Sequence, residues 1–135
     1  TLADLERLYA LAIQKSWWDS IDFLDEHVGS IVQRFPQAKA TMLAWSQDDN
    51  FWIRRLAIDH QLGFKLTTDT DLLAQIIRNN FGSNEFFINK AIGWSLREYS
   101  KVAPDWVRTF ITDYEAELNN LSIREGLKVL KRSSV

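Results

Sequence analysis

Apolar residues recur along this chain at the spacing of one helical face, with polar residues between them. The stretch that begins at Ser16 shows the pattern well, with apolar residues at i, i+4, i+7 and i+11: Trp17, Ile21, Leu24 and Val28. Trp18 and Asp22 are four residues apart and fall on the neighbouring face, outside this apolar stripe. An indole and a carboxylate that share a face beside the buried side form a candidate site. The alternative is an amphipathic helix with a solvated acid.

The pattern predicts eight helices. The expected ranges are 2–15, 16 to about 29, 36–46, 51–62, 71–81, 85 to about 101, a seventh from 104, and a last helix to about 132. Expected start signals are Ser16, Asn84 and a capping box formed by Ser122 and Glu125. Expected ends are near Gly29, Gly63 and Gly82, and residues 31–35 are expected to form a short apolar turn before Pro36. Strand alternation is missing from the sequence, so the predicted fold class is all-α.

An internal repeat refines this fold class. Aromatic pairs open the second, fourth and sixth predicted helices, at Trp17-Trp18, Phe51-Trp52 and Phe86-Phe87, and the pairs begin 34 and 35 residues apart. Repeats of this length that contain two helices are typical of α-solenoids. The tetratricopeptide consensus of small residues does not fit, so we predict one HEAT-like or armadillo-type domain over residues 1–135. The second helix of each repeat is expected to line a concave face.

Aligning the three helices on these aromatic pairs brings charged and aromatic residues into one predicted stripe. Its members are Trp18, Asp22, Arg55, Lys90, Trp94 and Arg97, together with Trp52, Phe87, Asp25 and Asp59. If the repeats stack, this stripe combines an acid, indoles and several cations on one concave surface. The alternative is a stripe that core aromatics and solvated charges merely share. Trp45 and Trp106 lie off the stripe and are expected to pack in the core.

Composition limits the chemistry. The chain has 135 residues, of which 46% are hydrophobic and 25% charged, as in a globular domain. It has no cysteine, which excludes disulfides, thiolate metal sites and a cysteine nucleophile. His27 and His60 are isolated, so we expect no metal and no cofactor. The sequence shows no membrane-spanning run, and we expect no membrane partner. The net charge of −2 argues weakly against nucleic acid, although affinity follows the local field rather than the net charge.

The predicted stripe suits a substrate with an anionic backbone and a cationic reacting group. Arginine and lysine bind phosphate oxygens, and indoles stack on bases or sugars. A fixed carboxylate such as Asp22 can stabilise the positive charge that develops when an N-glycosidic bond breaks, or it can position water. A nucleotide with a positively charged alkylated base fits this combination.

Four segments resemble those of the AlkD-type DNA alkylation repair glycosylases. Residues 15–22 resemble the segment WWD-x-[VI]-D, and residues 50–58 resemble N-x-W-x-RR-x-A-I. Residues 86–99 resemble FFI-x-KAIGW-x-LREY, and residues 121–128 resemble LS-x-RE-x-LK. The resemblance runs in order from about residue 5 to about residue 130. It implies a HEAT-like superhelix that removes cationic alkylated purines, such as 3-methyladenine and 7-methylguanine, from double-stranded DNA in base excision repair.

The resemblance also implies roles for individual residues. The family's catalytic aspartate falls on Asp22, its cleft tryptophans fall on Trp18 and Trp94, and its phosphate-contacting arginine falls on Arg55. Arg54 remains the alternative for the phosphate contact. Lys90 and Arg97 are expected to assist in binding DNA. The family is implied to work from the backbone side, without a deep pocket for a flipped base.

Members of this family are usually longer, with further helices at the N-terminal side. We therefore expect this chain to be the C-terminal larger part of such a protein. We also expect the protein to be a monomer. Its expected location is the cytoplasm, with nucleoid association when it is bound to DNA. Two alternatives remain open from the sequence. One is a non-catalytic DNA-binding relative, and the other is a HEAT-like scaffold for protein interactions.

Overall fold

The computed structural model describes residues 3–15 and 18–133, and it describes side-chain surroundings for residues 3–11, 13 and 26–130. Within these ranges the chain forms eight α-helices and no strand, which confirms the predicted all-α class. The helices are α1 (Ala3–Lys15), α2 (Trp18–Arg34), α3 (Lys39–Trp45), α4 (Phe51–Asp59), α5 (Thr70–Arg78), α6 (Phe86–Ser100), α7 (Pro104–Asp113) and α8 (Asn120–Ser133). Two short 3₁₀ turns, η1 (Pro36–Ala38) and η2 (Lys65–Thr67), precede α3 and α5.

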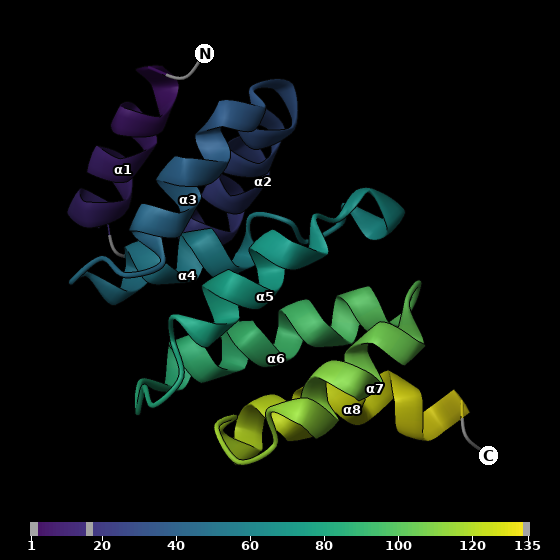
Figure 1. The fold of residues 1–135 in the computed structure, drawn as a ribbon. Helices are drawn as coiled ribbons and strands as arrows, with labels where there is room; N and C mark the ends of the chain where they lie inside the picture. The colour runs from purple at the N-terminus through teal and green to yellow at the C-terminus, as the bar shows by residue number, and fades with distance from the viewer. Residues whose placement is uncertain (1–2, 16–17, 134–135) are drawn as a thin grey trace.

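The even-numbered helices form a continuous row. Helix α2 packs against α4, α4 packs against α6, and α6 makes its most extensive contact with α8. Helices α3 and α5 contact each other and also α4, so they form a second row beside the first, as Figure 1 shows. This order of helices is the one expected of a helical repeat, in which each pair stacks on the next. The HEAT-type assignment within this class stays a prediction.

The aromatic pairs of the repeat occupy equivalent places in space. Phe51 is the first residue of α4 and Phe86 is the first residue of α6. The Trp52 and Phe87 ring centroids are 5.1 Å apart, and those of Phe51 and Phe87 are 6.2 Å apart. The first pair is only partly described, because Trp17 lies outside the described residues and Trp18 begins α2. The second and third repeats are therefore joined through their aromatic pairs.

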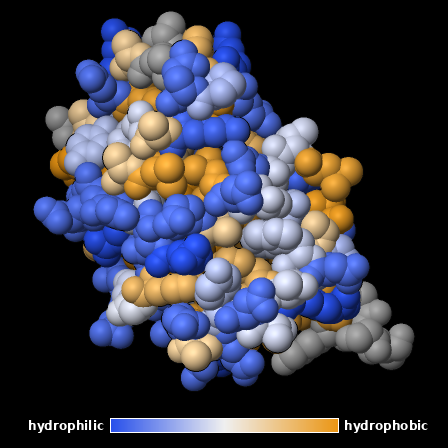
Figure 2. Space-filling view, in the orientation of Figure 1, coloured by the Kyte–Doolittle hydropathy of each residue, from blue (hydrophilic) through white to orange (hydrophobic). Residues whose placement is uncertain are grey.

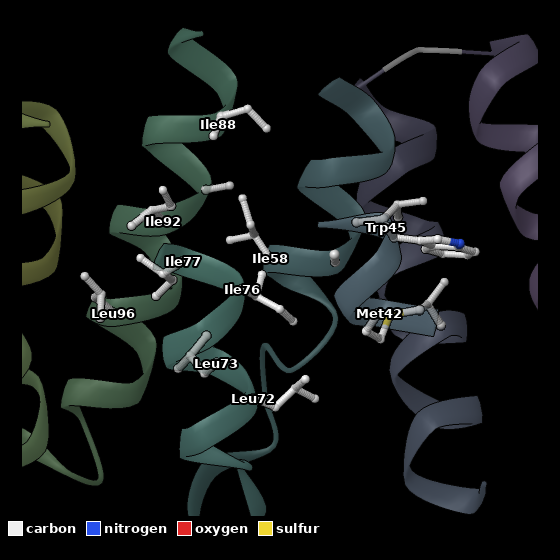
Figure 3. Close-up of a cluster of buried hydrophobic side chains, with 14 of the residues drawn as sticks. Met42, Trp45, Ile58, Leu72, Leu73, Ile76, Ile77, Ile88, Ile92 and Leu96 are labelled. Atoms are coloured by element: carbon white, nitrogen blue, oxygen red, sulfur yellow. The ribbon is translucent and has the colours of Figure 1, made fainter. Parts of the chain in front are cut away.

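The core is aliphatic and lies between the two rows. Side chains from α3, α4, α5 and α6 meet there, with Ile58, Ile76 and Ile92 essentially inaccessible to solvent (Figure 3). Burial of each such side chain contributes about 1.5–3 kcal/mol to folding. Figure 2 shows a largely hydrophilic surface on the face that Figure 1 presents, with hydrophobic residues in separate patches. Trp45 is buried against Tyr9, and Trp106 stacks on Phe110, so both tryptophans pack in the structure as the sequence predicts.

Helix α2 is longer than the sequence indicated. It continues to Arg34, so the predicted end near Gly29 and the predicted apolar turn at residues 31–35 are wrong. Gly29 has a packing role instead, because a Cβ there would lie 2.3 Å from the backbone oxygen of His60. The glycine allows the end of α4 to approach α2, and Ile31 and Val32 belong to the buried side of the same helix.

Two predicted helix caps are also wrong. Helix α8 begins at Asn120, and the amide N–H of Leu121 donates to Asn119 Oδ1 at 2.9 Å. Ser122 therefore lies inside α8, where its hydroxyl donates to the backbone oxygen of Asn89 at 2.7 Å and joins α8 to α6. At the start of α6 the cap position is Glu85 and not Asn84.

Other helix ends match the prediction more closely. Asn50 caps α4 by accepting a hydrogen bond from the amide of Trp52 at 2.9 Å. Helices α4 and α5 end at Asp59 and Arg78, a few residues earlier than expected, and turns lead from them to Gly63 and Gly82. Both glycines have a φ of 85°, a conformation that glycine adopts without steric cost. Both stop positions therefore mark real breaks in the helical pattern.

Candidate DNA-contacting cleft

A small cleft opens between α4 and α6, where the predicted stripe lies. Its lining residues are Arg55 and Asp59 from α4 and Phe87, Lys90, Ala91 and Trp94 from α6. The space enclosed is about 260 Å³ and is open to solvent. Three of the predicted site residues, Arg55, Lys90 and Trp94, therefore meet at one place although 39 residues separate the first from the last in sequence.

Arg55 forms the buried wall of the cleft. Its side chain and that of Asp59 are one helical turn apart on α4, and Arg55 Nε lies 3.4 Å from Asp59 Oδ2. Both residues are buried, with 5% and 3% of their surfaces exposed. The guanidinium carbon also lies 5.9 Å from the ring centroid of Trp52. The carboxylate and the indole hold the guanidinium in a defined orientation, as a buried charge requires.

Lys90 and Trp94 form the outer wall. They are also one helical turn apart, on α6, and Lys90 Nζ lies 5.9 Å from the Trp94 ring centroid and 5.6 Å from that of Phe86. Trp94 is 38% exposed, which is high for an indole. This wall therefore presents an ammonium group between two aromatic rings at the surface.

Arg54 does not line the cleft. Its Nη1 atom donates to the backbone oxygen of Asp48 at 2.9 Å, and this bond directs the guanidinium to the loop before α4. The structure thus separates the two adjacent arginines that the sequence left as alternatives. Arg55 is the one beside Lys90 and Trp94.

Trp18 and Asp22 lie on the first turns of α2, and α2 packs against α4. Their side chains lie outside the described part of the chain. The helix places the two residues four positions apart, hence on the same face. Their roles remain predictions.

A further group of charges lies beside the cleft at the junction of α6 and α8. Glu125 is buried, with Oε1 2.9 Å from Lys128 Nζ and Oε2 4.0 Å from Arg97 Nη1. The hydrogen bond from Lys128, aided by the charges of Lys128, Lys90 and Arg97, holds the pKa of Glu125 below its usual value, although burial opposes this shift. Arg97 therefore lies beside a carboxylate that the sequence analysis did not assign to it.

The family described as DNA alkylation repair enzyme matches residues 1–130 of the chain. The chain belongs to this family. A solved structure that resembles it is a predicted DNA alkylation repair enzyme from Enterococcus faecalis, with 41% sequence identity and a TM-score of 0.80. The match covers 92% of this chain and 59% of that one. Among curated proteins, the comparison finds no match.

Within the part of the chain that the structure describes, no three His, Cys, Asp or Glu side chains group as metal ligands would. The helices in the same part are all too short or too polar to cross a membrane.

The repeat alignment identified Arg55, Lys90 and Trp94, but it gave no role to the carboxylates that pair with the arginines of this region. The alignment placed Asp59 on the stripe without a role, and Glu125 was assigned only to a cap. The spacing of Glu125 and Lys128 could have suggested an ion pair on one helix. No spacing could have suggested Arg97 as a neighbour, because it lies on a different helix.

Proposed function

We propose that this chain carries the active site of a DNA glycosylase that excises cationic alkylated purines, of the 3-methyladenine and 7-methylguanine type, from double-stranded DNA. The observation that supports it most is the meeting of Arg55, Lys90 and Trp94 in one cleft. Membership in a family of DNA alkylation repair enzymes makes damaged DNA the natural substrate class. Because the chain spans 59% of its solved relative, the proposal concerns the full-length protein.

In this proposal the two walls of the cleft bind different parts of one nucleotide. Arg55 holds a backbone phosphate through its planar guanidinium, and Asp59 keeps that guanidinium oriented. Trp94 packs against the deoxyribose, and Lys90 neutralises a second phosphate oxygen. Trp18 packs against the other side of the sugar. Arg97 adds a cation farther along α6.

Asp22 acts on the reacting carbon in this mechanism. The N-glycosidic bond breaks with its electron pair going to the base nitrogen, which cancels the positive charge of the alkylated purine. The sugar becomes oxocarbenium-like, and a fixed carboxylate stabilises that charge. Water oriented by Asp22 then adds to the anomeric carbon and loses its proton to solvent. The products are a free base and an abasic site.

The size of the cleft agrees with recognition from the backbone side. Pockets that enclose small molecules usually have volumes of 300–1,000 Å³. The cleft between α4 and α6 holds about 260 Å³ even when open space is included. A cleft of this size does not enclose a flipped base.

The test is release of methylated bases from alkylated DNA by the full-length protein and its Asp22→Asn variant. We expect release by the natural protein and a loss of at least about 10²-fold in the variant, because an electrostatic group acting in the transition state is removed. Asp71→Asn, the same chemical change at an exposed position on α5, is the matched control and should release bases normally.

The other outcomes separate the alternatives. Equal release by the natural protein and Asp22→Asn would remove Asp22 from the mechanism. DNA binding without release by either protein would support a non-catalytic DNA-binding protein. If neither release nor salt-dependent DNA binding were found, a protein-interaction scaffold would be the better description.

A further inference from the structure

The junction of α6 and α8 carries charges that the proposed reaction does not use. We infer that Glu125 is a positioning residue that holds Arg97 and Lys128 together as a second binding site for a DNA backbone phosphate. This inference rests on the proposed function only in taking DNA as the ligand. It adds Lys128 as a further phosphate contact beside Arg97, and Glu125 as the carboxylate that organises the two cations.

The junction is unusually close. Gly93 faces α8, and a Cβ at this position would lie 2.5 Å from Glu125 Cβ and 3.2 Å from Ser122 Cα. The Ser122 hydroxyl donates to the backbone oxygen of Asn89 at 2.7 Å in the same interface. Residue 93 therefore has to be glycine, and Glu125 lies directly against the backbone of α6. This places Glu125 of α8 against the face of α6 next to Arg97.

Each oxygen of Glu125 has its own cation. Lys128 Nζ donates to Oε1 at 2.9 Å, and Arg97 Nη1 lies 4.0 Å from Oε2. The carboxylate is 10% exposed at its side chain, whereas Arg97 and Lys128 are 30% and 49% exposed. The acid is therefore covered and the cations reach the surface above it. The charges of Lys128, Lys90 and Arg97 all favour the ionised form of this one carboxylate.

The cations retain capacity for another ligand. The Arg97 guanidinium carries five N–H donors, and at 4.0 Å its contact with Glu125 is an ion pair without a close hydrogen bond. Its Nε atom is buried and has no hydrogen-bond partner among the described residues. Lys128 has two further N–H donors besides the one it gives to Glu125. A phosphodiester oxygen between the two heads would accept from the exposed N–H groups of Arg97 and Lys128.

The ion pair between Lys101 and Glu98 provides a comparison for the pair between Lys128 and Glu125. Lys101 pairs with Glu98 at 3.0 Å, also three residues apart, and its side chain is likewise 49% exposed. Glu98, however, is 44% exposed and has no second cation within ion-pair distance among the described residues. The Lys101 pair is an ordinary surface ion pair, which contributes little. The buried acid and the second cation distinguish the site at Glu125.

The experiment measures binding of the full-length protein to a short unmodified DNA duplex over a series of salt concentrations. Lys128→Gln should weaken binding and reduce the slope of log affinity against log salt by about 0.9, the value of one lost phosphate contact. Lys101→Gln, with the same charge change and the same exposure, should leave the slope unaltered. A slope unchanged in Lys128→Gln would overturn the inference.

Glu125→Gln gives the sharper test, because a neutralising role and a positioning role for Glu125 predict opposite changes in DNA affinity. If Glu125 only neutralised nearby cations, its removal would tighten DNA binding. The positioning role predicts weaker binding at every salt concentration, and no further loss when the change is added to Arg97→Gln/Lys128→Gln. Tighter binding, or an additive loss in the triple variant, would overturn the inference. Lys128 is at the surface, so its variant keeps the test valid if Glu125→Gln fails to fold.

The two proposals fail in different ways. Natural protein that binds the duplex, with Lys128→Gln and Glu125→Gln both equal to it, would refute the second phosphate site and leave the glycosylase proposal intact. Natural protein that neither binds duplex DNA nor releases methylated bases would refute both.

Discussion

The Arg55 guanidinium and the Asp59 carboxylate form an ion pair along α4 that solvent barely reaches, with 3.4 Å between Nε and Oδ2. Such a pair adds little net stability over a well-packed apolar pair, because both charges lose their hydration. It does fix the direction of the arginine. In the proposed function, Asp59 orients Arg55 for contact with a phosphate.

Asp59→Ala should be strongly destabilising, because it leaves the Arg55 charge buried without this carboxylate. The expected loss in the free energy of unfolding is about 3–5 kcal/mol, measured by urea denaturation. Arg55→Met/Asp59→Leu removes both charges and should lose much less. If the single and double variants lost equal stability, the cost would come from packing and not from the buried charge.

Gly93→Ala tests the closeness of α6 and α8. The new methyl group would lie 2.5 Å from Glu125 Cβ, so the helices must separate, at a cost of about 1–3 kcal/mol in thermal or urea unfolding. Gly126→Ala is the matched control on the facing helix. Its nearest neighbours would be Ile111 Cδ1 and Leu96 Cβ, both at 3.2 Å, so a smaller displacement is needed than at Gly93. Equal losses at the two positions would contradict the close contact at Gly93.

Replacement by alanine should affect Trp45 and Trp94 in different ways. Trp45→Ala removes a ring that is 7% exposed and should cost about 3–5 kcal/mol of stability. Trp94→Ala removes a ring that is 38% exposed, so it should cost less stability than Trp45→Ala, while base release falls. Unfolding curves and a base-release assay on the same preparations measure both effects. A Trp94→Ala variant that unfolds as readily as Trp45→Ala would make Trp94 a core residue.

The features that could be predicted from the sequence are those that arise from regularly spaced residues. Helical spacing and the recurring aromatic pairs were sufficient for the all-α class and for placing Arg55, Lys90 and Trp94 on one surface. These features follow from the geometry of a helix and from the stacking of equivalent helices. Each can be read from a regular spacing in the sequence, either within one helix or between equivalent helices.

The features that sequence missed depend on which helices approach one another. Gly29 looked like a helix end, but its role is to accommodate the backbone at His60. Ser122 looked like a cap, but its partner is the Asn89 carbonyl on another helix. The hydrogen bond that directs Arg54 to the loop at Asp48 also depends on tertiary placement and could not be read from the sequence. Local patterns carry no information on such partners.

His60 gives the stability a pH dependence. The ring is buried at the end of α4, and its Nδ1 atom lies 2.6 Å from the Ala57 backbone oxygen. A carbonyl only accepts hydrogen bonds, so Nδ1 carries the proton. The buried Nε2 atom has no partner in the described part of the structure. Burial lowers the pKa of His60 to about 4, mainly because a second proton would create a charge away from water.

Whether stability rises or falls with pH depends on which state, folded or unfolded, binds more protons. An unfolded chain takes up this proton near pH 6.5, whereas the folded chain does so only near pH 4. Between these values the unfolded state binds more protons, so stability falls as the pH is lowered from 6.5 to 4. The total loss is on the order of 3 kcal/mol. Urea unfolding at several pH values measures it.

His60→Gln should remove this slope, whatever its effect on stability at neutral pH. Asp69 and Glu125 also have lowered pKa values, from pairing with Lys39 and Lys128, and their contributions are lost at lower pH. Both carboxylates are present in the natural chain and the variant, so the difference between the two curves isolates the histidine. Parallel curves from pH 6.5 to 4 would mean that His60 remains accessible to protons in the folded protein, contrary to its burial between α2 and α4.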